Sequence, residues 1–269
     1  MRKSPWVIIL GIVFLAGIYF FVAPLPGGLS IAQATPRMGN NCAACHTTRG
    51  SSKTSTSSFD LDKCDGFSST GRNPYFILET GYQMIFEGRE KRHNAQLTIT
   101  VLNETRIIHI IIAGTPADVE TRVVEERLTH DGVLAELSRN YFSICNRTNS
   151  VFYFGEAVES YDPDGTTVIS TEGSWEAGIS GAQPGVIMPG TVLLGGKYFQ
   201  EIAPGVAMDR AEIVSLSEIV NTPEQTFTDC LKTAETSPLV RGKEFKYYAR
   251  DVGLVRDGNL KLKQHGFLP

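Results

Sequence analysis

Five residues near the N-terminus have the types and the spacing for metal or redox chemistry. They form the motif Cys42-Ala43-Ala44-Cys45-His46, a C-x-x-C-H pattern. Two thiols at this spacing can form thioether bonds to the vinyl groups of haem, while the adjacent imidazole coordinates the iron. The motif therefore predicts one covalent haem c attached to Cys42 and Cys45, with His46 as the proximal iron ligand.

Other chemistry is open to the same side chains. Cys42 and Cys45 could form a disulfide in an oxidising compartment, or Cys42, Cys45, His46 and Cys64 could hold zinc as a Cys₃His site. The motif could also be vestigial. Because random placement of five cysteines and five histidines in 269 residues would give C-x-x-C-H roughly twice in a thousand chains, the sequence favours haem.

A haem iron bound by His46 would take a second axial ligand, which the sequence does not assign. Met38 is too near the motif to reach the opposite face of the haem. His109 lies within Ile107–Ile112, a context that favours a strand histidine with a local partner over an iron ligand. The distal ligand stays unknown, and the candidates in the later part of the chain are Met84, His93, His109, Met188 and Met208.

The motif follows a hydrophobic segment. Arg2 and Lys3 precede an uncharged run from Trp6 to Ala23, which at about 18 residues can span a bilayer as a helix. The small-residue pattern Ala32-Gln33-Ala34 would also suit a cleaved signal peptide. We expect residues 1–24 to be a single-pass membrane anchor, and either interpretation places the rest of the chain outside the cytoplasm, in the periplasm.

Residues 25–72 are expected to be a flexible linker that carries the haem-binding motif. This stretch is rich in Gly, Ser, Thr and Pro, and Ser51 to Ser58 is almost wholly Ser, Thr and Lys. Such a composition supplies too little apolar surface to build a core. The folded extracytoplasmic domain is therefore predicted to span residues 73–269.

That domain has the pattern of a mainly β fold. Short alternating segments such as Leu97–Leu102 and Phe245–Tyr248 are separated by turn signals such as His130-Asp131-Gly132. Arg256-Asp257-Gly258-Asn259 predicts a hairpin, and the β-branched residues of Thr115–Leu137 favour strands over a helix. We expect an antiparallel meander of about ten strands that forms a barrel, half-barrel or sandwich.

A long irregular segment, Glu172–Gly196, interrupts this pattern with seven glycines and two prolines. A plug that packs around Trp175 and closes one end of the barrel is favoured over a binding lid. Cys145 and Cys230 could form a disulfide or remain buried thiols, and the sequence does not decide between them.

The remaining composition excludes or disfavours several functions. The net charge of −4 gives no electrostatic footprint for nucleic acid. Carboxylates are plentiful, but none is paired with a nucleophile and a base at a recognisable spacing, so an electron carrier or accessory subunit is favoured over an enzyme.

Two resemblances support this interpretation. The C-x-x-C-H pentapeptide resembles the haem-attachment motif of c-type cytochromes. Residues 73–264 resemble a family of exported bacterial β-rich proteins of unknown function, on the segments Asn73–Phe76, Gly81-Tyr82, Tyr153–Glu156, Trp175–Gly190, Lys246–Ala249 and Val252–Val255. This second resemblance implies export and the extent of the domain, but no activity, and members of that family generally lack C-x-x-C-H.

The sequence therefore predicts a membrane-tethered, extracytoplasmic monohaem protein that transfers electrons or serves as an accessory subunit of a larger membrane complex. The expected partners are the membrane, through the N-terminal helix, and a redox or membrane protein complex. The alternative is a non-redox envelope β protein that binds an apolar ligand or a protein, with Cys42 and Cys45 as a disulfide or zinc site.

Overall fold

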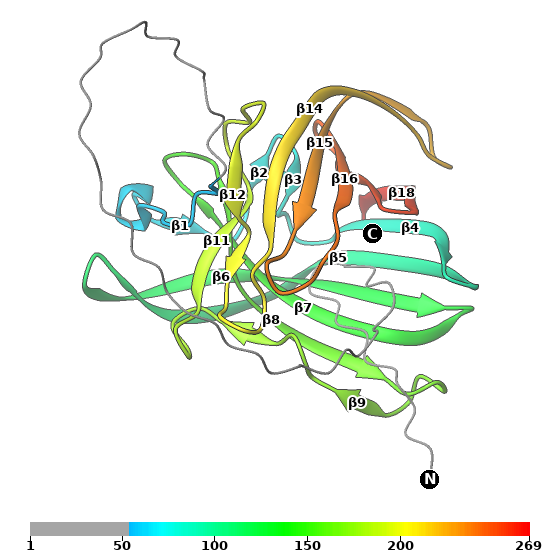
Figure 1. Ribbon diagram of the computed structural model, residues 1–269, viewed down its shortest axis with the longest axis horizontal. Coiled ribbons are helices and arrows are strands. Elements are labelled where there is room, and N and C mark those ends of the chain that lie inside the picture. The colour runs from blue at the N-terminus through cyan, green and yellow to red at the C-terminus, as the bar shows by residue number, and fades with distance from the viewer. Residues whose placement is uncertain (1–53) are drawn as a thin grey trace, which may run out of the picture. The chain divides into compact units, whose positions relative to one another are not determined.

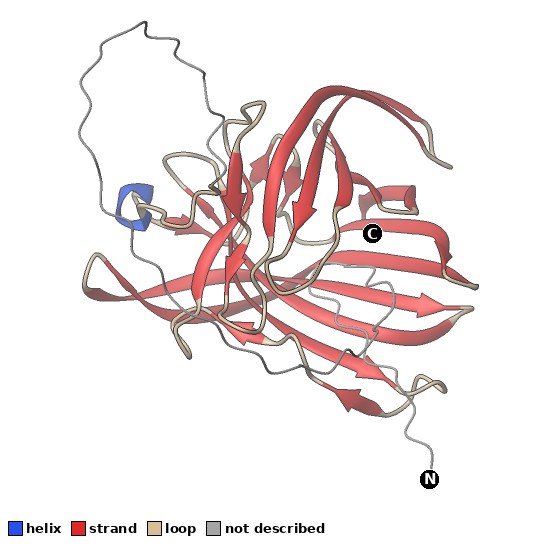
Figure 2. Ribbon diagram, in the orientation of Figure 1, coloured by secondary structure: helices blue, strands red, loops and turns tan. Residues whose placement is uncertain are grey.

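A computed structural model describes residues 54–269 of the chain. These residues form one short 3₁₀ helix and eighteen strands, and strand residues make up 63% of the described fold (Figures 1 and 2). The elements are η1 (Leu61–Cys64), β1 (Phe67–Ser68), β2 (Arg72–Asn73), β3 (Phe76–Ile77), β4 (Tyr82–Glu90), β5 (His93–Ile112), β6 (Thr115–His130), β7 (Val133–Cys145), β8 (Val151–Tyr161), β9 (Val168–Ser170), β10 (Trp175–Glu176), β11 (Gln183–Met188), β12 (Lys197–Phe199), β13 (Glu201–Ile202), β14 (Arg210–Asn221), β15 (Thr226–Thr236), β16 (Glu244–Ala249), β17 (Gly253–Asp257) and β18 (Leu260–Phe267). The prediction of a mainly β, antiparallel fold is confirmed.

The strands follow one another as a meander. The order in the sheet is β14-β15-β16-β17-β18-β4-β5-β6-β7-β8, so the C-terminal strand β18 pairs with β4. Along this path Leu262 lies opposite Phe86, and Phe86 opposite Leu97. Because alternate residues of a strand share one face, these pairs build a continuous apolar layer across neighbouring strands.

The segment Lys197–Ile202 joins the two ends of this sheet. Its first part, β12, pairs with β14, and its second part, β13, pairs with β11, which lies beside β8. Gln200 stands between the two parts, and its backbone N–H donates to the carbonyl of Asp209 at 2.7 Å. The meander is therefore a nearly closed antiparallel barrel.

Gly185 permits a close backbone contact at this junction. A Cβ atom on Gly185 would lie 2.4 Å from the backbone carbon and oxygen of Gln200. No side chain fits at that distance, so the closure requires glycine at this position of β11.

The folded domain begins earlier than the sequence suggested. Residues 54–72 were expected to belong to the linker, but Thr56 pairs with β12, donating to the carbonyl of Lys197 at 2.9 Å and accepting from Phe199 at 2.9 Å. Phe67 packs edge-on against Phe152 with 5.7 Å between ring centroids. These aromatic and backbone contacts outweigh the Ser/Thr-rich composition, so residues 55–72 are part of the barrel domain.

The Glu172–Gly196 segment supplies two strands, β10 and β11, and both pair with β8. Trp175 is buried, and its ring lies 5.1 Å from that of Tyr153, centroid to centroid. The Ala177 backbone N–H donates to the carbonyl of Phe154 at 2.8 Å. The expected burial of Trp175 is confirmed, whereas closure of one barrel end by this segment stays a prediction.

Sequence patterns missed the long hairpin of β14 and β15. Polar residues such as Glu212, Ser215 and Glu218 interrupt its apolar pattern, and the pairing shifts register between Ile213 and Ser215 and again beyond it. Figure 1 shows this hairpin (yellow to orange) curving upward away from the β4–β9 part of the sheet.

The predicted N-terminal helix, residues 1–24, and linker residues 25–53 lie outside the described residues. Among residues 54–269, no helix has the length and apolar character needed to cross a membrane.

Candidate functional site

The predicted haem-attachment residues, Cys42, Cys45 and His46, lie outside the described residues. The structure does determine how the later cysteines are used. Cys64 and Cys145 form a disulfide, with 4.9 Å between their Cα atoms, and Cys230 is a buried free thiol. The possible pairing of Cys145 with Cys230 is therefore wrong, because Cys145 is bonded to a different partner.

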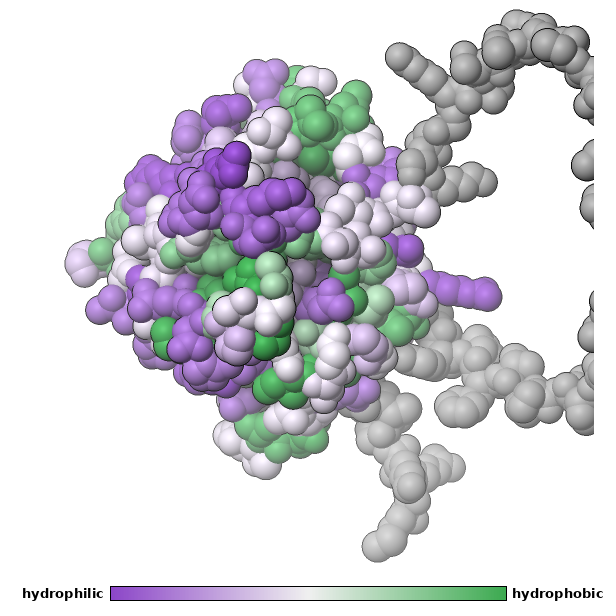
Figure 3. Space-filling model, turned by 90° about the vertical axis from the view of Figure 1, so that its left-hand side faces the viewer, coloured by the Kyte–Doolittle hydropathy of each residue, from purple (hydrophilic) through white to green (hydrophobic). Residues whose placement is uncertain are grey.

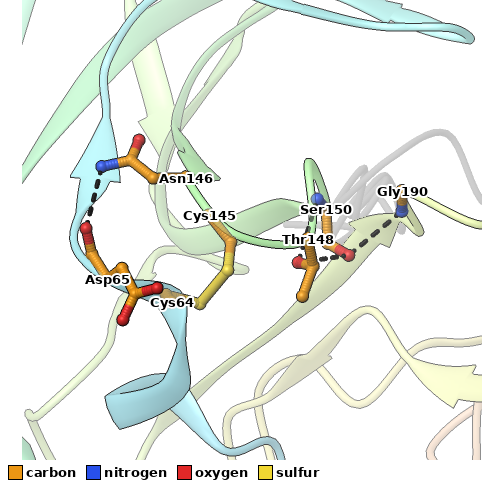
Figure 4. The surroundings of a disulfide bond; sticks show 7 residues. All are labelled: Cys64, Asp65, Cys145, Asn146, Thr148, Ser150 and Gly190. Atoms are coloured by element: carbon orange, nitrogen blue, oxygen red, sulfur yellow. Dashed lines mark hydrogen bonds between the residues drawn. A yellow bond between two sulfur atoms is a disulfide. The ribbon is translucent and has the colours of Figure 1, made fainter.

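The disulfide joins the start of the domain to the end of β7 (Figure 4). Next to it, the Arg147 backbone N–H donates to the carbonyl of Cys64 at 3.0 Å, and the Asn146 amide donates to the carbonyl of Asp65 at 3.2 Å. Both sulfur-bearing residues are buried. Cys64 is consequently not available as a zinc ligand, and the proposed Cys₃His set loses one of its four ligands.

The inside of the barrel is acidic. Alternation along the strands directs carboxyl groups to one face: Glu126 lies opposite Ser138, and Asn140 opposite Glu156. We call the following residues the interior acidic cluster: Glu90, Glu126, Glu136, Glu156, Glu201, Asp209, Glu235 and Asp257. All are buried except Glu126, which is half-buried.

Lys246 on β16 faces this cluster. Its Nζ lies 3.4 Å from Glu235 Oε2 and 3.6 Å from Asp257 Oδ2, and all three side chains are almost completely buried. Burial by itself lowers the pKa of Lys246, but the charges of Asp257 and Glu235 outweigh it, so the pKa lies well above its usual value. For Asp257, the effect of burial is larger than the opposing effect of the Lys246 charge, so its pKa rises to about 6.

Most carboxyl groups of the cluster bind protons more tightly than usual. Burial, followed by the nearby charges of Glu156 and Glu126, raises the pKa of Glu136 to about 10. Burial is also the main cause of the raised pKa of Glu156 and of Glu201, whose Oε1 accepts the Asp209 backbone N–H at 2.8 Å. Part of the cluster is therefore neutral near pH 7 and can donate hydrogen bonds.

Several interior polar atoms have no hydrogen-bond partner within residues 54–269. They include Tyr198 OH and Gln200 Oε1. Among the described residues, no group of three or more His, Cys, Asp or Glu side chains is arranged to hold a metal ion. The barrel interior therefore combines carboxyl groups of raised pKa with buried acceptor atoms that no described residue satisfies.

The four histidines of the described chain each contact a carboxylate. The pairs are His93 with Asp131 (2.6 Å), His109 with Asp118 (2.6 Å), His130 with Glu90 (2.9 Å) and His265 with Glu224 (2.8 Å). The sequence predicted a local partner for His109 but not the identity of Asp118. Because Ala113-Gly114 is the turn between β5 and β6, His109 and Asp118 lie opposite each other. Assigning the turn to Ala113-Gly114 in the sequence would therefore have predicted Asp118 as the partner of His109.

A groove of about 510 Å³ lies beside this hairpin. It is lined by Ser57–Asp62, Ile110–Ala113, Gly178 and residues 181–184. The left-hand side of Figure 1, which holds the β5–β6 turn, faces the viewer in Figure 3, where hydrophobic areas lie in hollows between hydrophilic ones. The groove brings the start of the described chain next to the end of β5.

Comparisons with known proteins give little that bears on function. No protein-family model matches the chain, and no curated protein matches it in sequence. Among solved structures, a crystal structure of a protein from Parabacteroides distasonis ATCC 8503, described as a candidate lipoprotein, is 14% identical with a TM-score of 0.33. The match covers 75% of this chain and 100% of that one, and a likeness at this level carries no argument about what the chain does.

Proposed function

We propose that this chain is an exported, membrane-tethered monohaem protein of the c type, which transfers electrons or serves as an accessory subunit of a larger membrane complex. Haem c would be attached to Cys42 and Cys45, with His46 as its proximal ligand. One observation carries the proposal. In the barrel domain Cys64 and Cys145 are bonded to each other, so neither of them is a partner for the thiols of Cys42 and Cys45.

Cys64 and Cys145 are bonded to each other, and Cys230 is a buried residue of β15. Of the five cysteines, Cys42 and Cys45 are therefore the two whose bonding the described residues do not determine. A zinc site built on them would have three of the four expected protein ligands, since Cys64 is used elsewhere. Haem attachment needs the three motif residues that the sequence provides.

The disulfide also bears on location. Disulfides persist outside the reducing cytoplasm, and they are rare inside it. Export directed by the Trp6–Ala23 segment would bring the motif to the same oxidising side of the membrane. The hydrophobic Trp6–Ala23 segment and the Cys64–Cys145 disulfide therefore both favour a location outside the cytoplasm, the first through export and the second through an oxidising environment.

A tether at residues 1–24 would place the barrel close to its partners. Tethering to the membrane raises the effective concentration of the domain near other membrane proteins without requiring high affinity. The barrel would serve as the docking or covering part of the molecule.

The decisive experiment is an intact mass and a reduced-minus-oxidised absorbance spectrum of full-length protein from a host that attaches haem. One covalent haem is expected, and the Cys42→Ala/Cys45→Ala variant should lose it. Cys230→Ala is the matched control, because it removes a cysteine outside the motif and should keep the haem. A colourless wild-type protein whose mass is lower by two hydrogens for a Cys42–Cys45 bond would refute the proposal.

A second candidate is a non-redox envelope protein whose working part is the barrel. The interior acidic cluster favours it, because the buried Tyr198 OH and Gln200 Oε1 beside Glu235 have no hydrogen-bond partner within residues 54–269. A guest suited to this interior would be cationic or rich in hydrogen-bond donors rather than apolar. Thermal melting of the haem-free protein with polyamines and with fatty acids tests this candidate, and stabilisation by the fatty acids alone would exclude the cationic guest.

A further inference from the structure

The outer face of β15 to β18 carries a row of basic and aromatic side chains. Lys232 on β15 lies opposite Tyr247 on β16. Tyr247 in turn lies opposite Arg256 on β17, which lies opposite Lys261 on β18. Paired residues project to the same side of a sheet, and the alternate residues of these strands are buried with the interior acidic cluster. The row therefore faces outward, on the part of the sheet where Figure 1 labels β15, β16 and β18.

Aromatic rings hold two of these cations in place. Lys232 Nζ lies 4.6 Å from the centre of the Phe245 ring and 5.1 Å from that of Tyr247. The guanidinium carbon of Arg256 lies 5.1 Å from the Tyr247 ring centre. Lys232 also contacts the carboxylate of Glu218 at 3.7 Å. Because an aromatic ring attracts a cation without neutralising it, Arg256 is ordered and keeps its full charge.

Most of the positive charges in this region have no carboxylate partner. We define the basic wall as Lys232, Arg241, Lys243, Arg256 and Lys261, and within residues 54–269 the last four form no ion pair. Like charges directly opposite each other, as Arg256 and Lys261 are, destabilise a sheet, and a bound anion would remove that cost. The net charge of −4 conceals this wall, because many carboxyl groups lie inside the barrel.

Apolar side chains are exposed among these charges. Residues 237–243 join β15 to β16, and within this loop Leu239 is 47% exposed. Phe245, near the start of β16, is 38% exposed. Arg241 and Lys243 lie between these two in the sequence, and both are exposed. Exposed apolar residues interleaved with Lys and Arg are typical of segments that lie in a membrane interface.

The combination of charge and apolar exposure favours a lipid surface over other anionic partners. An acidic polysaccharide would match the charges of the basic wall, but it would offer no apolar layer to Leu239 and Phe245. An anionic bilayer presents phosphate-bearing headgroups directly above hydrocarbon. Lys and Arg side chains can therefore bind the headgroups while the neighbouring apolar side chains enter the layer beneath.

We infer that the basic wall, together with Leu239 and Phe245, docks on the surface of an anionic phospholipid bilayer. The inference goes beyond the proposed function, because it requires neither haem nor the N-terminal segment. Docking turns the outer face of β15 to β18 toward the lipid and fixes the orientation of the barrel at the membrane.

The test follows hydrogen–deuterium exchange of the full-length protein by mass spectrometry in the presence of lipid nanodiscs. One set of discs contains phosphatidylcholine alone, and the other also contains phosphatidylglycerol. Residues 237–247 should exchange more slowly with the anionic discs than with the neutral ones. Added salt should abolish this difference, because it screens the charges. The turn at Ala113-Gly114 is the internal reference and should exchange equally with both.

Arg241→Gln/Lys243→Gln should weaken docking about 25-fold, since each cation near an anionic surface contributes about fivefold. Arg127→Gln/Arg147→Gln is the matched control. It makes the same change of net charge at exposed positions outside the basic wall, so the protection of residues 237–247 should stay as in wild type. Circular dichroism of each variant checks that the fold is kept.

Leu239→Ser keeps every charge and should still reduce the protection, because it removes an apolar contact with the bilayer. Equal exchange with both kinds of disc, or equal effects of the two double variants, would overturn the inference. Full protection of Leu239→Ser would also overturn it, as would protection of wild type by soluble polyglutamate to the level seen with anionic discs. Either result would mean that charge alone selects the partner.

Discussion

Lys246 Nζ lies 3.4 Å from Glu235 Oε2 inside the barrel, with both side chains shielded from water. The two residues sit on neighbouring strands, β16 and β15, two register positions apart, because Lys246 pairs with Thr233 and Glu235 with Glu244. Their ion pair, extended by Asp257, places a positive charge within an otherwise acidic interior. The stability of the barrel should therefore depend on this lysine and on pH.

Replacing Lys246 with Met should destabilise the domain by roughly 3–5 kcal/mol at pH 8, because Glu235 and Asp257 would lose their buried cation. The loss should be smaller at pH 5, where Asp257, whose pKa is raised to about 6 by burial, can take up a proton instead. Urea unfolding at both pH values measures the difference. Lys263→Met, which removes an exposed ion pair with Glu87, is the control and should change stability by at most about 1 kcal/mol.

The barrel should lose stability as the pH rises from about 5 to 9. The pKa of Glu136 is raised to about 10 in the folded state, whereas an unfolded chain has a glutamate pKa near 4.3. Between these values the folded protein binds more protons than the unfolded one, so its free energy of unfolding falls by up to about 1.4 kcal/mol per pH unit for such a group.

Glu136→Gln should make that dependence on pH less steep, because the amide does not titrate. Urea unfolding of the described domain at pH 5.5, 7 and 8.5 gives the slope. Glu104→Gln, at an exposed position, should leave the slope unchanged. A wild-type domain that becomes more stable toward pH 8.5 would contradict this account of the interior.

Loss of the Cys64–Cys145 disulfide should destabilise the domain by roughly 4 kcal/mol, because it closes a loop with a sequence separation of 81 residues. Cys64→Ala/Cys145→Ala tests this by chemical unfolding, and adding a reductant to wild type should reproduce the effect. The same double variant should still carry haem, which separates the structural cysteines from the motif cysteines. An unchanged unfolding midpoint would show that the bond does not form in solution.

Gly185→Ala should weaken the closure of the barrel by about 3 kcal/mol, since the new methyl group would overlap the backbone of Gln200. Near-ultraviolet circular dichroism should show altered packing, and urea unfolding gives the free energy. Ser217→Ala at an exposed position on β14 is the control and should stay within about 0.5 kcal/mol of wild type. Equal stability of the two variants would mean that the strands separate easily at this junction.

Local patterns were sufficient to predict the fold class. The turn residues His130-Asp131-Gly132 and Arg256–Asn259 join strands as expected, and Thr115–Leu137 is two strands, β6 and β7. Hairpins of this kind are predictable because turn chemistry and side-chain alternation act between residues that are close in the chain. The haem motif is equally local, and it stays a prediction.

The tertiary structure decided what depends on contacts between distant residues. The sequence did not indicate that Cys64 would meet Cys145, that Lys197–Ile202 would join both ends of the sheet, or that carboxyl groups from separate strands would converge on Lys246. Each of these depends on strand order and register, which are set by the summed packing of the whole barrel. The exposed His109 beside Ile107 and Ile111 belongs to the same class, because burial of a strand face depends on what lies across from it and not on the strand itself.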